Sequence, residues 1–158
     1  MDKLPVDSRI AEQLLLGTDV LTVLATSAET GGAFLAAQIR MPPGGGPPVM
    51  HRHAPGEVYY VIEGEFTFYS GGLGDPLSRT IAGPSQVVSL AGGTPHTIRN
   101  ESDKDAVAFV VHAPGGPMED FSRAAAALAA DGNPSVDAVL AIAERYGIEL
   151  LGPIPAAV

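Results

Sequence analysis

Short runs of apolar and β-branched residues, separated by glycine and proline, dominate the middle of the chain. Between about residues 18 and 112 these runs recur without an intervening helical pattern. Short strands at such spacing are typical of an antiparallel sandwich or barrel. The sequence therefore predicts an all-β core, with strands at 19–26, 33–41, 57–63, 65–70, 77–81, 86–90, 95–101 and 105–112.

The first sixteen residues are predicted to form a short helix before this core. Ser8 is placed to cap it, because a serine side chain accepts a hydrogen bond from the first helical turn. The apolar stripe of this helix would consist of Ile10, Leu14 and Leu15.

The segment after the core, about residues 117–147, is predicted to be helical. Pro117 suits the first turn of a helix, and Asp131-Gly132 ends it. A second helix would start at Pro134-Ser135 and stop at Gly147. We expect this tail to pack on the barrel and consider that it also closes one mouth over a ligand. The packing residues would be Val139, Leu140 and Ile142.

Composition limits the class of protein. The 158 residues suit one domain, residues 1–158, and contain no cysteine, which excludes disulfide scaffolds and thiolate metal sites. A net charge of −9 and a pI near 4.7 disfavour nucleic acid and anionic membranes as partners. With no signal peptide or membrane span expected, we predict a cytoplasmic protein that binds a small-molecule substrate. We also expect a homodimer that buries an exposed sheet edge.

Three of the four histidines are grouped in a pattern that favours metal binding. His51 and His53 are one residue apart, so on a strand their imidazoles point to the same face. Glu57 follows, and His96 lies in a later predicted strand. If the two strands are neighbours, three imidazoles and a carboxylate converge. That ligand set suits one divalent ion, Fe, Mn, Ni, Co or Zn. His112 fits no such pattern and is expected to be structural.

The same residues belong to two longer motifs. In the first, Gly45 is followed after five residues by His51-x-His53, then by Glu57 and, after six further residues, by Gly64. The spacing resembles the first defining motif of the cupins, and every anchor position is filled.

The second cupin motif is present with two departures. It has Gly93, His96 and Asn100 at the expected positions, but Ser85 and Ala91 stand where the family has glycine and proline. These departures concern turn geometry rather than ligands. The resemblance covers about residues 18–112. It implies a double-stranded β-helix, or jelly-roll barrel, that binds a metal.

The substrate pocket can be outlined from strand parity. Tyr59 shares the face of the metal carboxylate, so we expect it in the pocket. Gln38 would be a polar group in an otherwise apolar strand, and Phe34 shares its face. We therefore include both in the predicted pocket. Two further aromatic residues are expected to fill the barrel instead, namely Phe66 and Phe68.

Three local features make the chain most similar to the quercetin-dioxygenase-like single-domain cupins. They are Pro47-Pro48, the Pro114-Gly115-Gly116 stretch before a helix, and the Tyr146-Gly147-Ile148-Glu149 tail. This resemblance implies a metal-dependent dioxygenase that acts on a small hydroxylated aromatic or enol, with Glu57 as proton acceptor. Two alternatives remain open. One is an isomerase, cyclase or lyase that acts on a carbonyl compound, and the other is a binding protein without turnover.

Overall fold

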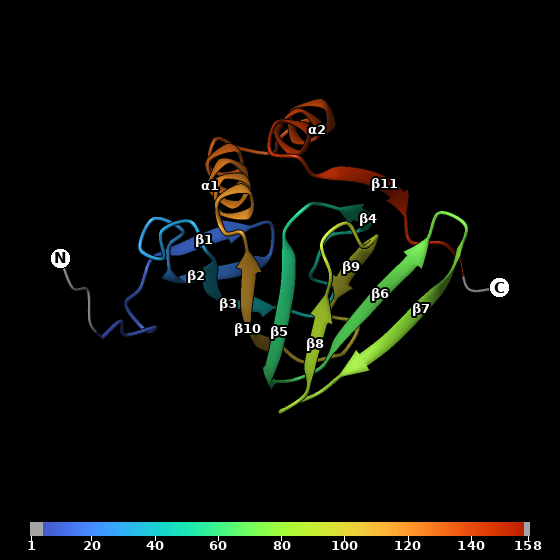
Figure 1. Cartoon of the computed structure of the whole chain (residues 1–158), viewed down its shortest axis with the longest axis horizontal. Helices are drawn as coiled ribbons and strands as arrows, with labels where there is room; N and C mark the ends of the chain where they lie inside the picture. The colour runs from blue at the N-terminus through green and yellow to red at the C-terminus, as the bar shows by residue number, and fades with distance from the viewer. Residues whose placement is uncertain (1–4, 157–158) are drawn as a thin grey trace.

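Two antiparallel sheets enclose the interior of the molecule, and two helices precede the last strand of the chain (Figure 1). The computed structural model describes residues 5–156. The first sheet has the order β1-β2-β3-β10-β5-β8, and the second has the order β11-β4-β9-β6-β7. The strands are β1 Gln13–Leu16, β2 Asp19–Ala25, β3 Leu35–Met41, β4 Val49–Arg52, β5 Gly56–Glu63, β6 Phe66–Gly72, β7 Asp75–Ala82, β8 Val87–Leu90, β9 His96–Arg99, β10 Ala106–Ala113 and β11 Glu149–Pro153; the helices are α1 Gly116–Ala130 and α2 Val136–Arg145.

The predicted all-β core is confirmed. Each of the eight predicted strands corresponds to an observed strand, with its ends displaced by at most two residues. The strand period of two is clear in β5, where Glu57, Tyr59 and Val61 are buried and the residues between them are not. Phe66 and Phe68 lie in the main core cluster, as expected.

The predicted N-terminal helix is wrong. Residues 5–12 contain turns and no helix, residues 1–4 lie outside the described part of the chain, and Ile10 is exposed. The segment ends instead in β1, which pairs with β2. Leu14 and Leu16 both pack against the main core cluster, and this alternation buries apolar side chains at a period of two rather than along a helical stripe.

The two predicted C-terminal helices are present, but the packing face of the second is wrong. Ser135 caps α2 by accepting a hydrogen bond from the Ala138 N–H at 3.2 Å. Val139 and Leu140 are exposed, whereas Ala143 is buried in a small cluster with Met118 of α1. The helix therefore packs on its neighbour through alanine. The chain then continues into β11, an unpredicted strand that pairs with β4.

The outer face of the six-stranded sheet is apolar and exposed. Val58, Tyr60 and Ile62 alternate with the buried residues of β5, and Phe109 and Val87 lie beside Tyr60 in the strand register. The homodimer that we expect remains a prediction. Within residues 5–156, no helix has both the length and the apolar character needed to cross a membrane.

Candidate metal centre

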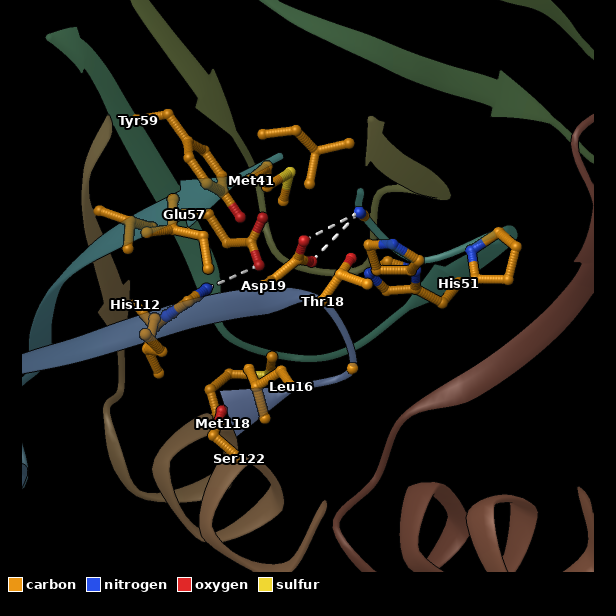
Figure 2. Close-up of a pocket in the computed structure, with 18 residues that line it drawn as sticks. Leu16, Thr18, Asp19, Met41, His51, Glu57, Tyr59, His112, Met118 and Ser122 are labelled. Carbon is orange, nitrogen blue, oxygen red and sulfur yellow. Dashed lines mark hydrogen bonds and ion pairs between the residues drawn. The ribbon is translucent and has the colours of Figure 1, made fainter. Parts of the chain in front are cut away.

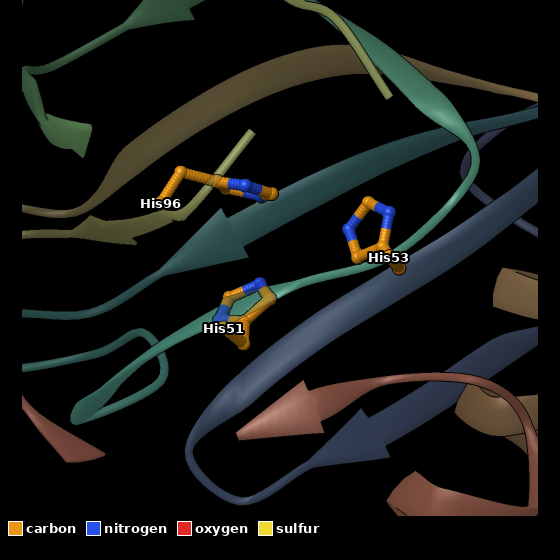
Figure 3. Close-up of side chains that lie close together, drawn as sticks. All are labelled: His51, His53 and His96. Atoms are coloured by element: carbon orange, nitrogen blue, oxygen red, sulfur yellow. The ribbon is translucent and has the colours of Figure 1, made fainter. Parts of the chain in front are cut away.

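Strands β4 and β9 bring the three motif histidines together. The two strands are antiparallel, with His51 directly opposite His96. His53 follows at the end of β4 (Figure 3). One side-chain nitrogen from each of the three lies within 4.8 Å of the other two. The predicted convergence of the imidazoles is therefore observed.

Backbone contacts hold the two motifs against each other. The Gly93 N–H donates a hydrogen bond of 2.8 Å to the His53 carbonyl. A Cβ at Gly92 would lie 2.0 Å from the Ala54 carbonyl oxygen, so only glycine fits there. The glycines of the second motif thus allow its loop to approach the first motif closely, which places His96 beside the other two imidazoles.

Each motif imidazole has its Nδ1 next to a backbone carbonyl two residues away. The distances are 3.3 Å from His51 to Val49, 2.9 Å from His53 to Pro55 and 2.7 Å from His96 to Thr94. A carbonyl accepts only, so Nδ1 carries the proton and Nε2 keeps a free lone pair. Burial, followed by the neighbouring charge of His96, lowers the pKa of His51 to about 4, which keeps this ring neutral at neutral pH. Neutral imidazoles with free Nε2 atoms are the form that ligates metals.

Glu57 lies among the imidazoles. Its Oε1 is 3.1 Å from His53 Nε2, and its Oε2 is 3.1 Å from His96 Nε2. Burial alone would raise the pKa of Glu57, but the adjacent imidazoles of His112, His53 and His96 outweigh it and hold this pKa well below its ordinary range. The carboxylate is therefore ionised.

These donors fit a divalent cation. His53 Nε2 and Glu57 Oε2 are fully buried and have no hydrogen-bond partner among the described residues, because the atom 3.1 Å from each is itself a lone-pair acceptor. Metal–nitrogen bonds of about 2.0–2.1 Å at right angles separate adjacent ligand atoms by about 3 Å. The two distances of 3.1 Å between Glu57 and the imidazoles match that value. His51, His53, His96 and Glu57 are thus the residues that would hold the ion.

His112 also belongs to this site, which differs from our expectation of a purely structural residue. It lies opposite Glu57 in the β5–β10 register, and its Nε2 is 2.9 Å from Glu57 Oε1. Its Nδ1 is buried and has no hydrogen-bond partner among the described residues. No motif signals this residue, because its contact with Glu57 depends on which strand pairs with β5.

A cavity of about 430 Å³ opens onto this centre (Figure 2). Its metal side is formed by His51, Glu57, Tyr59 and His112. Burial, reinforced by the charge of Glu57, raises the pKa of Tyr59 well above its ordinary value, so its hydroxyl stays protonated. Apolar side chains form most of the walls, including Leu21, Ile39, Met41, Ile98 and Val110.

Helix α1 contributes to the cavity, but two of the predicted pocket residues do not. Met118 and Ser122 of α1 line it, whereas no residue of α2 does. Gln38 and Phe34 are absent from its lining. Gln38 pairs with the exposed Phe109, because the alternate residues of β3 face the interior, and Phe34 precedes β3 and is itself exposed. The prediction that Gln38 and Phe34 face the cavity is therefore wrong.

Sequence reasoning missed Asp19, a buried acid that lines the cavity beside the β1–β2 turn. It is the first residue of β2 and accepts a hydrogen bond from the Gly46 N–H. It belongs to no motif and is one of 18 acidic residues, so nothing in the sequence distinguishes it.

The family comparison and the structural comparison agree on the class of protein. Residues 37–112 match the cupin domain family. No curated protein matches the chain in sequence. Together with the two-sheet barrel and the three-histidine site, the family match and the structural neighbours below support the cupin superfamily.

Three similar solved structures illustrate the fold. The polyketide cyclase RemF from Streptomyces resistomycificus has a TM-score of 0.62 and 18% identity, over 72% of this chain and 80% of that one. A predicted oxalate decarboxylase from Thermotoga maritima has a TM-score of 0.59 and 22% identity, over 70% and 98%. A variant of oxalate decarboxylase from Bacillus subtilis has a TM-score of 0.59 and 18% identity, over 70% of this chain. The matched region spans only 29% of the Bacillus enzyme. At these identities the likeness concerns the fold alone.

Proposed function

We propose that this chain is a metal-dependent cupin enzyme that acts on a small, uncharged, hydroxylated aromatic or enol, as a dioxygenase. The observation that carries the proposal is the apolar cavity, which opens directly onto His51 and the ionised Glu57. A cavity of this volume, with apolar walls and a few convergent polar groups, suits a small ligand.

The charge of the cavity indicates which ligands it favours. Among its lining residues there is no lysine or arginine, but there are two carboxylates, Asp19 and Glu57. Apart from the bound ion, a small dicarboxylate such as oxalate would find no cationic group among these residues, and the two carboxylates would repel it. This disfavours the substrate named for the decarboxylases of similar fold and favours a neutral molecule.

The chain's own residues would bind the substrate and remove its proton. His51, His53 and His96 would hold the ion through Nε2. When bound, a divalent ion would supply Lewis acidity and, if redox-active, a means of reaction with O₂. Glu57 would accept the proton of the substrate hydroxyl as its O–H bond breaks, and His112 would orient Glu57 by donating to Oε1. The apolar walls would exclude water.

A second candidate reaction is isomerisation or cyclisation of a carbonyl compound without O₂. The pairing of Glu57 with His112 favours it, because a buried carboxylate with an adjacent imidazole can accept a proton and return it to another carbon or oxygen. RemF, a cyclase, is among the proteins of similar fold.

The test combines metal analysis with oxygen uptake. Protein purified without chelator, and protein reconstituted with Fe, Mn, Ni, Co or Zn, is assayed for O₂ consumption against flavonols and smaller enols. We expect uptake with at least one redox-active ion. If no ion supports uptake, the dioxygenase proposal is wrong. Substrate turnover under argon would then support the isomerase or cyclase.

A further inference from the structure

Asp19 is the second buried carboxylate of the cavity, and the metal centre does not use it (Figure 2). Asp19 is only 7% exposed to solvent. Among the described residues, its only hydrogen-bond donor is the Gly46 N–H, at 3.1 Å from Oδ2 and 3.3 Å from Oδ1. An ionised carboxylate offers about four acceptor sites. Most of the accepting capacity of Asp19 therefore has no protein partner.

The glycine loop before the first histidine is built around this carboxylate. A Cβ at Gly45 would lie 2.5 Å from Asp19 Oδ1, and one at Gly46 would lie 2.2 Å from the Ile98 carbonyl oxygen. The Arg99 guanidinium donates to the carbonyls of Gly46 and Gly44, which holds the loop in place. The carboxylate is thus a fixed acceptor at the cavity wall.

Stability does not account for a buried acid in this position. Burial raises the pKa of Asp19, and neither the hydrogen bond from Gly46 nor the charge of Arg99 compensates fully. A desolvated carboxylate with one weak donor costs free energy in the folded protein. A ligand that supplies a donor in the cavity would remove that cost, since it would satisfy the vacant acceptor sites.

Asp19 and Glu57 come from different strands of the cavity wall. Asp19 begins β2 and Glu57 lies on β5, and strands β3 and β10 separate them in the same sheet. Apolar residues of the intervening strands, Ile39, Met41 and Val110, also line the cavity. A single ligand that contacts both carboxylates therefore needs an apolar body with polar groups at two separate places.

We propose that Asp19 binds a second hydroxyl group of the substrate, which makes the substrate a polyhydroxylated aromatic or enol. The inference rests on the proposed function, because the first oxygen is the one that reacts at the metal centre. The hydroxyl donates to Asp19, so the ligand is neutral at this position. A carboxylate there is excluded by repulsion.

Binding to zinc-loaded protein tests the inference without turnover, because zinc has no redox chemistry. Isothermal titration compares two probes, the parent flavonol, whose only hydroxyl is the enolic one, and quercetin, which has hydroxyls on both ring systems. We expect wild-type protein to bind quercetin at least about tenfold more tightly, the scale of a hydrogen bond to a charged acceptor. Asp19→Asn should lose that preference and leave the affinity for the parent flavonol unchanged.

Asp105→Asn is the matched control, because Asp105 is an exposed acid paired with Arg40 outside the cavity. It should retain the preference. Equal affinities of wild-type protein for the two probes would overturn the inference whether or not the Asp19 variant folds. An equal loss for both probes in Asp19→Asn would also overturn it. If neither probe binds wild-type protein, the proposed substrate class fails as well, so the two failures are distinguishable.

Discussion

The metal side and the Asp19 side of the cavity are built in different ways. On the metal side, one carboxylate has three imidazoles around it, and the pKa of Glu57 is held low despite burial. On the other side, Asp19 has one backbone donor, and burial raises its pKa. Both groups are more than nine-tenths buried. The difference teaches that burial alone does not determine the direction in which the pKa of an acid shifts. The hydrogen-bonding and charged partners that the fold provides determine it.

The largest effect is expected on the metal side. His51→Ala and His96→Ala should each lower metal affinity strongly, because each removes a ligand nitrogen. Loss of a residue that only contacts a ligand lowers metal affinity by about 10–100-fold, and we expect a larger loss here. Metal content by mass spectrometry after dialysis measures it. Asp19→Asn serves as the control, and it should keep the metal. If it loses the metal as the histidine variants do, the two sides are not separate.

A smaller effect is expected for His112, which contacts Glu57 but is not one of the proposed ligands. His112→Ala should lower metal affinity about tenfold and leave the stoichiometry at saturation unchanged. Competition with a chromophoric chelator gives the affinity. His112→Gln retains an N–H donor and should recover part of the loss. A stoichiometry of zero in His112→Ala would make His112 a ligand and would revise the proposed set.

The Asp19 side should instead gain stability when its charge is removed. Because the pKa of Asp19 in the folded protein is raised above its ordinary value of 3.8, the folded protein binds more protons than the unfolded protein in the pH window above 3.8. Stability therefore falls as pH rises through that window, and the full cost is present at neutral pH. Asp19→Asn should be more stable by roughly 0.5–1 kcal/mol at neutral pH, measured by thermal melting.

The same melting experiment has a built-in control. The gain in Asp19→Asn should disappear when the pH falls below the window, since both proteins then carry a neutral side chain. Asp105→Asn should show no comparable gain at neutral pH. A loss of stability in Asp19→Asn at neutral pH would mean that the carboxylate is structural.

The last effect concerns a turn that belongs to neither side of the cavity. Ser85 replaces the opening glycine of the second motif and adopts a φ of 71°, a conformation that favours glycine. Ser85→Gly should stabilise the protein by about 1 kcal/mol and leave metal binding unchanged. Denaturant unfolding measures it. Ser78→Gly, in β7, should be destabilising instead, and equal effects of the two variants would contradict the argument from backbone conformation.

Local sequence was sufficient for much of the fold and for the cluster of candidate metal ligands. Strand period and glycine or proline punctuation predicted eight strands, because both act over a few residues. The two motifs predicted the metal ligands, because the spacing of His51, His53 and Glu57 is local and His96 ends a tight glycine turn. Asn100 of the second motif bonds locally near a turn, because its amide donates to the Lys104 carbonyl and accepts from the Ser102 hydroxyl.

Tertiary structure decided everything that depends on which strands are neighbours. β1 and β11 are short and are stabilised by pairing with β2 and β4, so their own residues carry little signal. The face of β3 that meets the cavity, and with it the place of Gln38, followed from register rather than from composition. His112 reached Glu57, and Asp19 reached the cavity wall, through contacts between segments that are distant in the chain. The sequence by itself determined eight of the strands and predicted the ligands of one metal ion, whereas only the fold placed a second carboxylate in the same cavity.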